Sequence, residues 1–109
     1  MVRPANIFFK VLTGEGLSLE EDRLQFSLPR GVKDGDWHSF YSELGCMLYK
    51  NPLPFYKQGH SIYVAEFDAA DITTSYQEII WVKRFRLVRQ ATNLDLKPFG
   101  IYRAIAQVI

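Results

Sequence analysis

Three stretches of the chain carry hydrophobic residues in patterns typical of β-strands. Residues 6–12, NIFFKVL, place apolar side chains on both faces, which is typical of a central strand covered on two sides. Residues 24–28, LQFSL, alternate apolar and polar positions before Pro29, and predict a half-buried strand. Residues 61–68, SIYVAEFD, are rich in β-branched and aromatic residues and predict a third strand.

Between the second and third of these stretches the pattern changes to the period of a helix. When each residue advances by about 100°, the large apolar side chains of residues 36–50 gather on one face, and polar side chains lie opposite. That apolar face consists of Trp37, Phe40, Tyr41, Leu44, Met47 and Leu48. Asp36 is a candidate N-cap, and Asn51 with Pro52 is a stop signal. The sequence predicts one principal amphipathic helix over about 36–50.

Residues 76–90 can be interpreted in two ways. Ser75 and Glu78 have the spacing of a capping box, which favours a helix. However, six of the ten residues from Ile79 to Val88 are β-branched or aromatic, and a helical wheel scatters the apolar residues around its whole circumference, so a strand is favoured. The thirteen residues EIIWVKRFRLVRQ would make a strand about twice the usual length. We therefore expect a bulge near Lys83–Arg84, or an overhang that pairs with another subunit.

Taken together, these elements predict one α+β domain over residues 1–109. It would contain a single, mainly antiparallel sheet of about four to five strands, with the helix at about 36–50 packed on one face. The apolar segment 99–109 completes the domain as a strand or a short helix, and its periodicity does not decide between the two.

Composition and charge limit the class of function. The chain has 13 basic and 12 acidic residues, and this balance argues against a protein built mainly to coat nucleic acid. One cysteine excludes an internal disulfide, and no apolar run has the length of a membrane span or of a secretory signal. We expect a cytoplasmic protein that does not bind membranes.

The segment around Trp81 and Phe85 is a candidate binding surface, because it interleaves these aromatic residues with cations. The cations are Lys83, Arg84, Arg86 and Arg89. On an exposed face they would neutralise phosphates while Trp81 or Phe85 stacked on bases. The alternative is a core strand whose aromatic side chains are buried and whose cations extend to the rim. The core strand is the favoured interpretation.

A second candidate surface is the loop NPLPFYKQGH, which is stiffened by two prolines. Its aromatic residues Phe55 and Tyr56 lie close in sequence to Lys57 and His60, and preset aromatic groups on loops are good anchors for a partner. Alternatively, Phe55 folds back to cover the end of the predicted helix at about 36–50.

The remaining clusters point to chemistry only weakly. Asp34, Asp36 and His38 have alternate spacing suitable for a metal, but a turn and a helix cap explain both aspartates. Cys46 has a possible partner only in His60, through tertiary contact. The carboxylates Glu66, Asp68 and Asp71 follow the strand at 61–68, with no third group placed beside them. We expect no metal and no cofactor, and a catalytic function is less favoured than binding.

The sequence thus predicts a non-catalytic binding or interaction protein that acts as a homo-oligomer or as an accessory subunit. The simplest form is a two-fold dimer whose interface contains residues 79–89 and part of 100–109, because an overlong strand leaves unpaired backbone groups. A nucleic-acid-binding module that uses residues 81–89 is the alternative function. An enzyme of unknown reaction class, with a pocket near His60 and Asp68, is the third.

Overall fold

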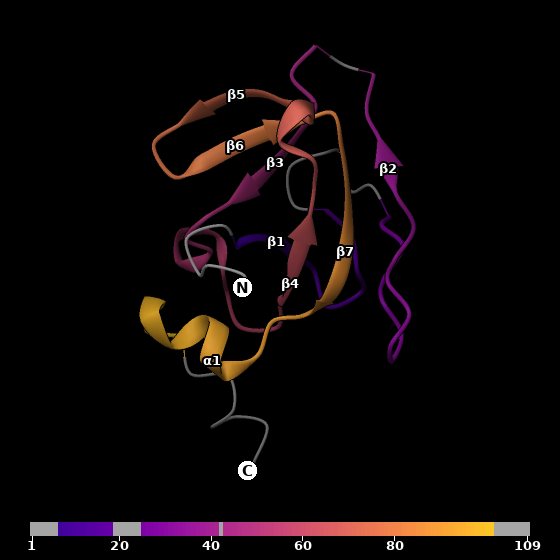
Figure 1. The fold of residues 1–109 in the computed structure, drawn as a ribbon. Coiled ribbons are helices and arrows are strands. Elements are labelled where there is room, and N and C mark those ends of the chain that lie inside the picture. The colour runs from indigo at the N-terminus through magenta and orange to yellow at the C-terminus, as the bar shows by residue number, and fades with distance from the viewer. Residues whose placement is uncertain (1–6, 19–24, 42, 102–109) are drawn as a thin grey trace.

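A computed structural model describes residues 7–18, 25–41 and 43–101, and within them the chain forms one seven-stranded antiparallel sheet (Figure 1). The strand order is β2-β7-β4-β1-β3-β6-β5. The strands are β1 Phe8–Leu12, β2 His38–Ser39, β3 Cys46–Tyr49, β4 Ser61–Glu66, β5 Ile72–Tyr76, β6 Ile79–Val82 and β7 Arg84–Gln90. The helical elements are α1 Asn93–Leu96 and three 3₁₀ turns, η2 Leu53–Phe55, η3 Ala69–Asp71 and η4 Lys97–Phe99.

The predicted α+β class with a principal helix is therefore wrong. Residues 36–50 contain β2, a turn and β3, and the helical residues α1 and η4 together span only 93–99. Gly45 gives the physical reason. Its φ is +93°, and a Cβ at this position would lie 2.1 Å from the carbonyl oxygen of Val82, so the chain must turn here against β6. Of the six apolar residues with helical spacing, only Met47 and Leu48 lie in a strand, and as neighbours in β3 they pack against different core clusters.

Strand β1 lies at the centre of the sheet, as its apolar faces predicted. It pairs with β4 from Phe8↔Ala65 to Leu12↔Ser61, and with β3 through Phe9↔Tyr49. Its two faces enter two separate core clusters. The Phe85 cluster consists of Leu12, Phe26, Cys46, Leu48, Ala65, Ile80, Val82, Phe85 and Leu87. The Tyr49 cluster consists of Phe9, Val11, Tyr49, Ile62, Val64, Ala91, Leu96 and Ile101.

The stretch 79–90 is extended, which was the favoured prediction. It is divided into β6 and β7 by a break at Lys83, near the position where a bulge was expected. Before this break β6 pairs with β3 and β5, and after it β7 pairs with β4 and β2. The backbone of Lys83 forms two hydrogen bonds at this break. Its N–H donates to Asp71 O (2.9 Å), and its carbonyl accepts from Phe40 N (2.7 Å). One continuous segment thus supplies a strand to each side of the sheet. Both strands contribute residues to the Phe85 cluster.

Of the predicted strand at 24–28 the structure describes residues 25–28, and these do not form a strand. Gln25 makes a single bridge to Leu17, and residues 26–29 follow an irregular path. Phe26 is nevertheless buried against Phe85, with the ring centroids 5.4 Å apart. Within the segment 25–41, Gly35 lies so close to two other backbones that a Cβ would be 2.3 Å from Ser27 O and 3.1 Å from Leu87 O.

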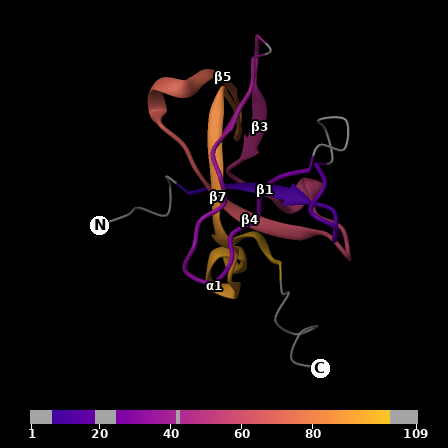
Figure 2. The ribbon, with the colours of Figure 1, turned by 90° about the vertical axis from the view of Figure 1, so that its right-hand side faces the viewer.

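Helix α1 lies at one end of the sheet and contributes Leu96 to the Tyr49 cluster (Figure 2). A capping box between Thr92 and Asp95 starts the helix, and Gly100 ends η4 with φ of +75°. The segment 102–109, which contains most of the undecided C-terminal element, lies outside the described residues. No helix in the described part of the chain is long and apolar enough to cross a membrane.

Candidate functional site

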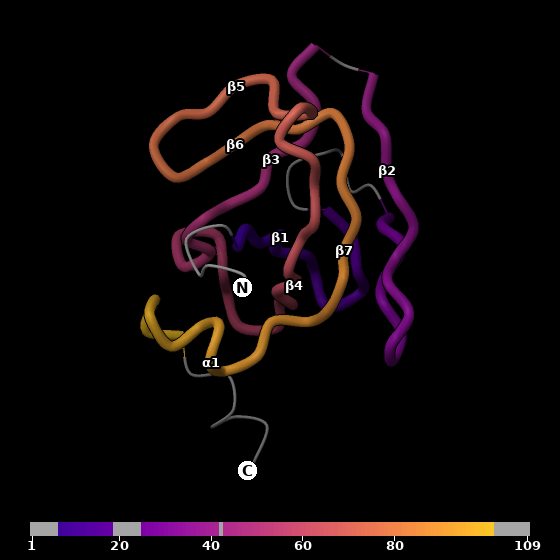
Figure 3. Tube along the Cα trace, in the orientation of Figure 1, coloured from indigo at the N-terminus to yellow at the C-terminus, as the bar shows by residue number. Residues whose placement is uncertain are grey.

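The most exposed element of the sheet is β5, whose residues are Ile72, Thr73, Thr74, Ser75 and Tyr76. All five are exposed, and β5 is the last strand of the sheet, with β6 as its neighbour on the inner side. The β5–β6 hairpin projects from the body of the molecule (Figure 3). The strand contains no charged residue and no proline. Natural sheets usually protect an edge with one of these, so β5 is open to pairing.

Local sequence explains why this hairpin forms. Three β-branched residues and a tyrosine favour the extended conformation, and Gln77 turns the chain with φ of +55° before Glu78 and β6. At its start, β5 carries a bulge between Ile72 and Thr74. The Thr73 hydroxyl Oγ1 anchors this point, with Leu44 O at 2.6 Å and Trp81 O at 3.2 Å. The bulge shields the first half of the edge, so pairing is left to residues 74–76.

The backbone direction of Ser75 follows from the register. Tyr76 opposes Ile79 across the two-residue turn, and Ser75 opposes Ile80. In an antiparallel ladder adjacent residues alternate between pointing toward the partner strand and away from it. The closing pair of a two-residue hairpin exchanges its hydrogen bonds, so both the N–H and the C=O of Ser75 point away from β6.

Exposed apolar side chains lie beside this edge. Tyr76 is 66% exposed, Ile72 is 37% exposed, and Leu44, which contacts Thr73, is 51% exposed. Large apolar side chains exposed next to an unprotected edge strand are typical of an interaction surface. We call β5 together with Leu44 the edge surface.

The structure separates the two aromatic residues that were predicted to share a binding surface. Phe85 is fully buried in the Phe85 cluster, so it is a core residue and not a contact residue. Trp81 is half-buried in β6, opposite Met47 of β3 and Thr74 of β5. The break at Lys83 sends the two residues to opposite flanks of the sheet, Trp81 next to the edge strand β5 and Phe85 next to the edge strand β2.

Two of the candidate cations are occupied by carboxylates. Arg86 Nε donates to Glu66 Oε1 at 2.6 Å, and its Nη2 lies 3.2 Å from Asp34 Oδ2. Arg89 forms a bidentate pair with Asp95. Burial alone would raise the pKa of the Asp95 carboxyl, but hydrogen bonds from Arg89 and Thr92 outweigh it and lower that pKa. These ion pairs reduce the positive charge that strand β7 offers to a phosphate.

The sequence did not reveal the position of Trp37. Its ring lies beside β7, with the guanidinium carbon of Arg84 at 4.1 Å and that of Arg86 at 4.8 Å from the ring centroid. These are cation–π contacts across the β2–β7 pair. The predicted helix at 36–50 placed Trp37 on an apolar helix face, so the sequence pattern did not indicate these contacts. The pairing of β2 with β7 is a long-range contact, and nothing in the local pattern indicates it.

The proline-rich loop is folded onto the molecule. Phe55 stacks on Tyr49 with centroids 3.9 Å apart, and both Phe55 and Tyr56 pack against the Tyr49 cluster. Lys57 and His60 close the following turn, because Lys57 N donates to His60 Nδ1 at 3.2 Å and His60 N donates to Lys57 O at 3.0 Å. Phe55 therefore folds back as in the alternative interpretation, but it covers the Tyr49 cluster, because the predicted helix is not formed.

The candidate metal ligands have other partners. Asp34 pairs with Arg86, and His38 Nε2 accepts a hydrogen bond from Ser27 N at 3.0 Å. Burial lowers the pKa of His38, and the charge of Asp36 opposes this shift in part. Nowhere in residues 7–18, 25–41 and 43–101 do three His, Cys, Asp or Glu side chains form a group able to hold a metal ion.

The candidate catalytic residues lie in different parts of the fold. Cys46 is fully buried in β3, opposite Val82, whereas His60 belongs to the turn before β4. Asp68 caps η3 by accepting from Ala70 N at 3.0 Å, and Asp71 accepts the Lys83 N–H through its backbone carbonyl. These contacts give Cys46 and Asp68 structural roles in the core and in a turn.

No protein-family model, curated protein or solved structure matches this chain.

Proposed function

We propose that this is a non-catalytic interaction protein that associates with a second copy of itself through the edge surface. The observation that carries the proposal is β5, an edge strand with no charge whose five residues, Ile72 and Tyr76 among them, are all exposed, next to the exposed Leu44. Such a strand extends its sheet by pairing with another strand, because its outward N–H and C=O groups have the geometry of a ladder.

The geometry of Ser75 suggests how two copies pair. A two-fold axis at Ser75 sets it opposite Ser75 of the second copy, and the two residues exchange N–H···O=C bonds. In the same register Thr74 lies opposite Tyr76 of the second copy, on both sides of the axis. Aromatic and β-branched residues form favourable cross-strand pairs. The bulge at Ile72–Thr74 ends the paired region, which keeps the interface short.

The chemistry of the strand favours a second copy over a charged partner. Residues 72–76 carry no charge, so two copies meet without repulsion and without leaving a buried charge unpaired. The opposite edge of the sheet is less suitable, since β2 contains only His38 and Ser39. We expect a reversible dimer with a dissociation constant on the order of micromolar or weaker. A short interface leaves only a small net free energy of binding after the cost of association.

The test places charges at the proposed axis. Ser75→Asp and Ser75→Lys each bring like charges face to face in the dimer, so each variant alone should weaken self-association by about fivefold or more. Mixing the two variants should restore it, because opposite charges then meet. Mass measurements by analytical ultracentrifugation over a range of concentrations report each case.

Ser39→Asp is the matched control, because Ser39 is also an exposed serine on an edge strand. It should leave self-association unchanged. A wild type that stays monomeric at high concentration contradicts the proposal. So does a pair of Ser75 variants that associate as well alone as in the mixture.

A further inference from the structure

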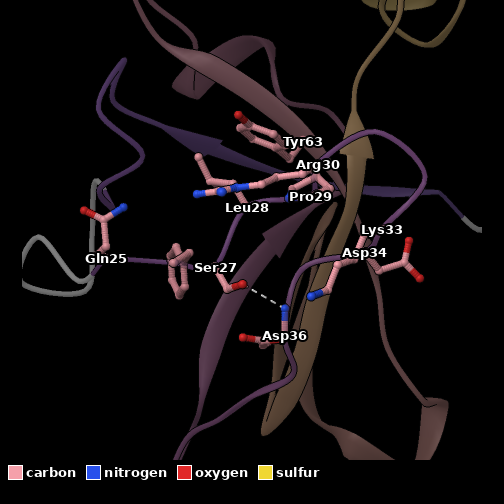
Figure 4. A pocket seen from close by; sticks show the side chains of 10 residues that line it. Gln25, Ser27, Leu28, Pro29, Arg30, Lys33, Asp34, Asp36 and Tyr63 are labelled. Carbon is pink, nitrogen blue, oxygen red and sulfur yellow. Dashed lines mark hydrogen bonds between the residues drawn. The ribbon is translucent and has the colours of Figure 1, made fainter.

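A cavity of about 480 Å³ lies on a different part of the molecule from the edge surface. It is formed by the segment 25–36 and by Tyr63 of β4 (Figure 4). Its volume falls within the range of small-molecule sites. Four of its lining residues are charged, namely Arg30, Lys33, Asp34 and Asp36.

The backbone around this cavity is held in place before any ligand arrives. Arg30 and Lys33 form a tight turn with reciprocal backbone bonds of 2.8 Å and 2.9 Å. Ser27 is fixed twice, since its N–H donates to His38 Nε2 and its Oγ accepts from Asp36 N at 2.9 Å. A preorganised frame lowers the entropy cost of binding.

The charged residues of the lining are two cations and two carboxylates, so their formal charges balance. Arg30 and Lys33 supply two cations, and in Figure 4 the Arg30 side chain extends between Tyr63 and Ser27, whereas Lys33 extends toward Asp36. The Asp34 carboxylate points the other way and lies 3.2 Å from Arg86, which also pairs with Glu66. Asp36 is therefore the carboxylate that remains to oppose the two cations. The guanidinium of Arg30 is the group in this cavity that a small monoanion complements.

The apolar part of the lining limits the ligand further. Leu28 and Pro29 supply half-buried apolar surface, and the ring of Tyr63 lies next to Arg30 (Figure 4). A flat apolar body fits against these groups, while a carboxylate reaches the guanidinium of Arg30. Inorganic phosphate has the charge but lacks the apolar body.

From the cavity, the two cations and the apolar surface, we infer that this protein binds a small organic monocarboxylate with a flat apolar body between the segment 25–36 and Tyr63. Arg30 pairs with the carboxylate, Lys33 adds positive charge, and Leu28 and Tyr63 contact the apolar body. Both cations are exposed, so screening by water limits the affinity, and we expect a dissociation constant on the order of 1 mM for a simple probe. This inference does not depend on the dimer.

The test is a titration of the intact protein with benzoate, followed by backbone amide NMR. Shifts should concentrate on Ser27, Asp36 and Tyr63. Benzamide, the neutral analogue, and inorganic phosphate should each bind about fivefold to tenfold more weakly than benzoate. Arg30→Gln and Lys33→Gln should weaken benzoate binding, the former by about tenfold, since a charge-assisted hydrogen bond is lost.

Lys57→Gln is the control, because Lys57 is an exposed lysine that does not line the cavity. It should bind benzoate as the wild type does. Arg30 and Lys33 are exposed, so both variants should keep the dispersed spectrum of the folded protein. The inference is wrong if the shifts do not map to the cavity, if benzamide binds as well as benzoate, or if Arg30→Gln binds like the wild type.

Discussion

The backbone N–H of Ser27 donates a hydrogen bond to Nε2 of His38 across 3.0 Å. The imidazole also packs against Phe26 and Phe85, with ring centroids at 5.0 Å and 5.8 Å. An Nε2 atom that accepts a hydrogen bond carries no proton, so the ring is neutral and its proton lies on Nδ1. This single contact joins the irregular segment 25–29 to β2 and the Phe85 cluster.

The first prediction concerns the effect of pH on stability. Burial lowers the pKa of His38 in the folded protein, whereas the unfolded chain keeps a value near 6.5. Between these two values the unfolded state binds more protons, so the free energy of unfolding should fall as the pH drops from about 6.5 toward the lowered pKa. Denaturant unfolding at a series of pH values measures this slope. His38→Gln should flatten it, and an equal slope in both proteins would exclude His38 as its source.

The second prediction compares two glycines with the same backbone angle. Gly45 and Gly59 both have φ of +93°, but a Cβ at Gly45 would lie 2.1 Å from Val82 O, whereas nothing lies within 4 Å of a Cβ at Gly59. Gly59→Ala should therefore cost about 1 kcal/mol through backbone strain alone. Gly45→Ala should cost about 3 kcal/mol or more, because it also pushes β3 away from β6. Chemical denaturation checks both, and equal losses would contradict the turn at Gly45.

The third prediction separates the two aromatic residues of the stretch 79–90. Phe85→Ala should lower the free energy of unfolding by about 3–5 kcal/mol, since Phe85 is fully buried. Trp81→Ala should cost no more than about half as much, since Trp81 is only half-buried. Thermal or urea unfolding of the two variants decides the order. A larger loss for Trp81 would mean that the Phe85 cluster is not the main core.

The fourth prediction concerns the pair of Arg89 and Asp95, which joins β7 to the start of α1. Asp95→Asn should cost about 1 kcal/mol, because Asp95 serves both the capping box and the ion pair. The lowered pKa of Asp95 means that its contribution is present above the unfolded value of about 3.9 and is lost as the pH falls through the folded value.

A double-mutant cycle with Arg89→Gln isolates the ionic part of this pair. The coupling energy should be modest, about 0.5–1 kcal/mol, since the Arg89 side chain is 45% exposed. A coupling of zero would show that Asp95 acts only as a cap.

The sequence pattern identified the strands whose environment is uniform along their length. Residues 6–12 and 61–68 contain β1 and β4, which are adjacent in the middle of the sheet, and the break in the stretch 79–90 falls at Lys83. These segments are apolar on both faces, so local composition reflects their burial.

The pattern failed where a tertiary contact overrides it. Trp37, Phe40 and Leu48 have helical spacing, yet Trp37 lies beside Arg84, Phe40 stacks on Phe85, and Leu48 is in β3. Gly45 within the predicted helix was the available signal against it, because glycine destabilises a helix interior by about 1 kcal/mol.

The edge strand β5 was also detectable but was missed. The sequence ITTSY, followed by two turn residues and IIWV, has the pattern of a hairpin. The capping-box spacing of Ser75 and Glu78 favoured a helix instead. However, the position of β5 at the edge depends on the order of all seven strands in the described residues. No local sequence pattern indicates that order.

The most direct test of the proposed self-association is amide hydrogen exchange at Ser75, measured by NMR from about 10 µM to about 1 mM protein. In a monomer this N–H points to water and exchanges rapidly, whereas Tyr76 N–H points toward β6 and serves as the internal reference. We predict that exchange at Ser75 slows relative to Tyr76 as the concentration rises, because the Ser75 amide enters a ladder with the second copy. An exchange rate at Ser75 that stays fast and independent of concentration would contradict pairing through β5.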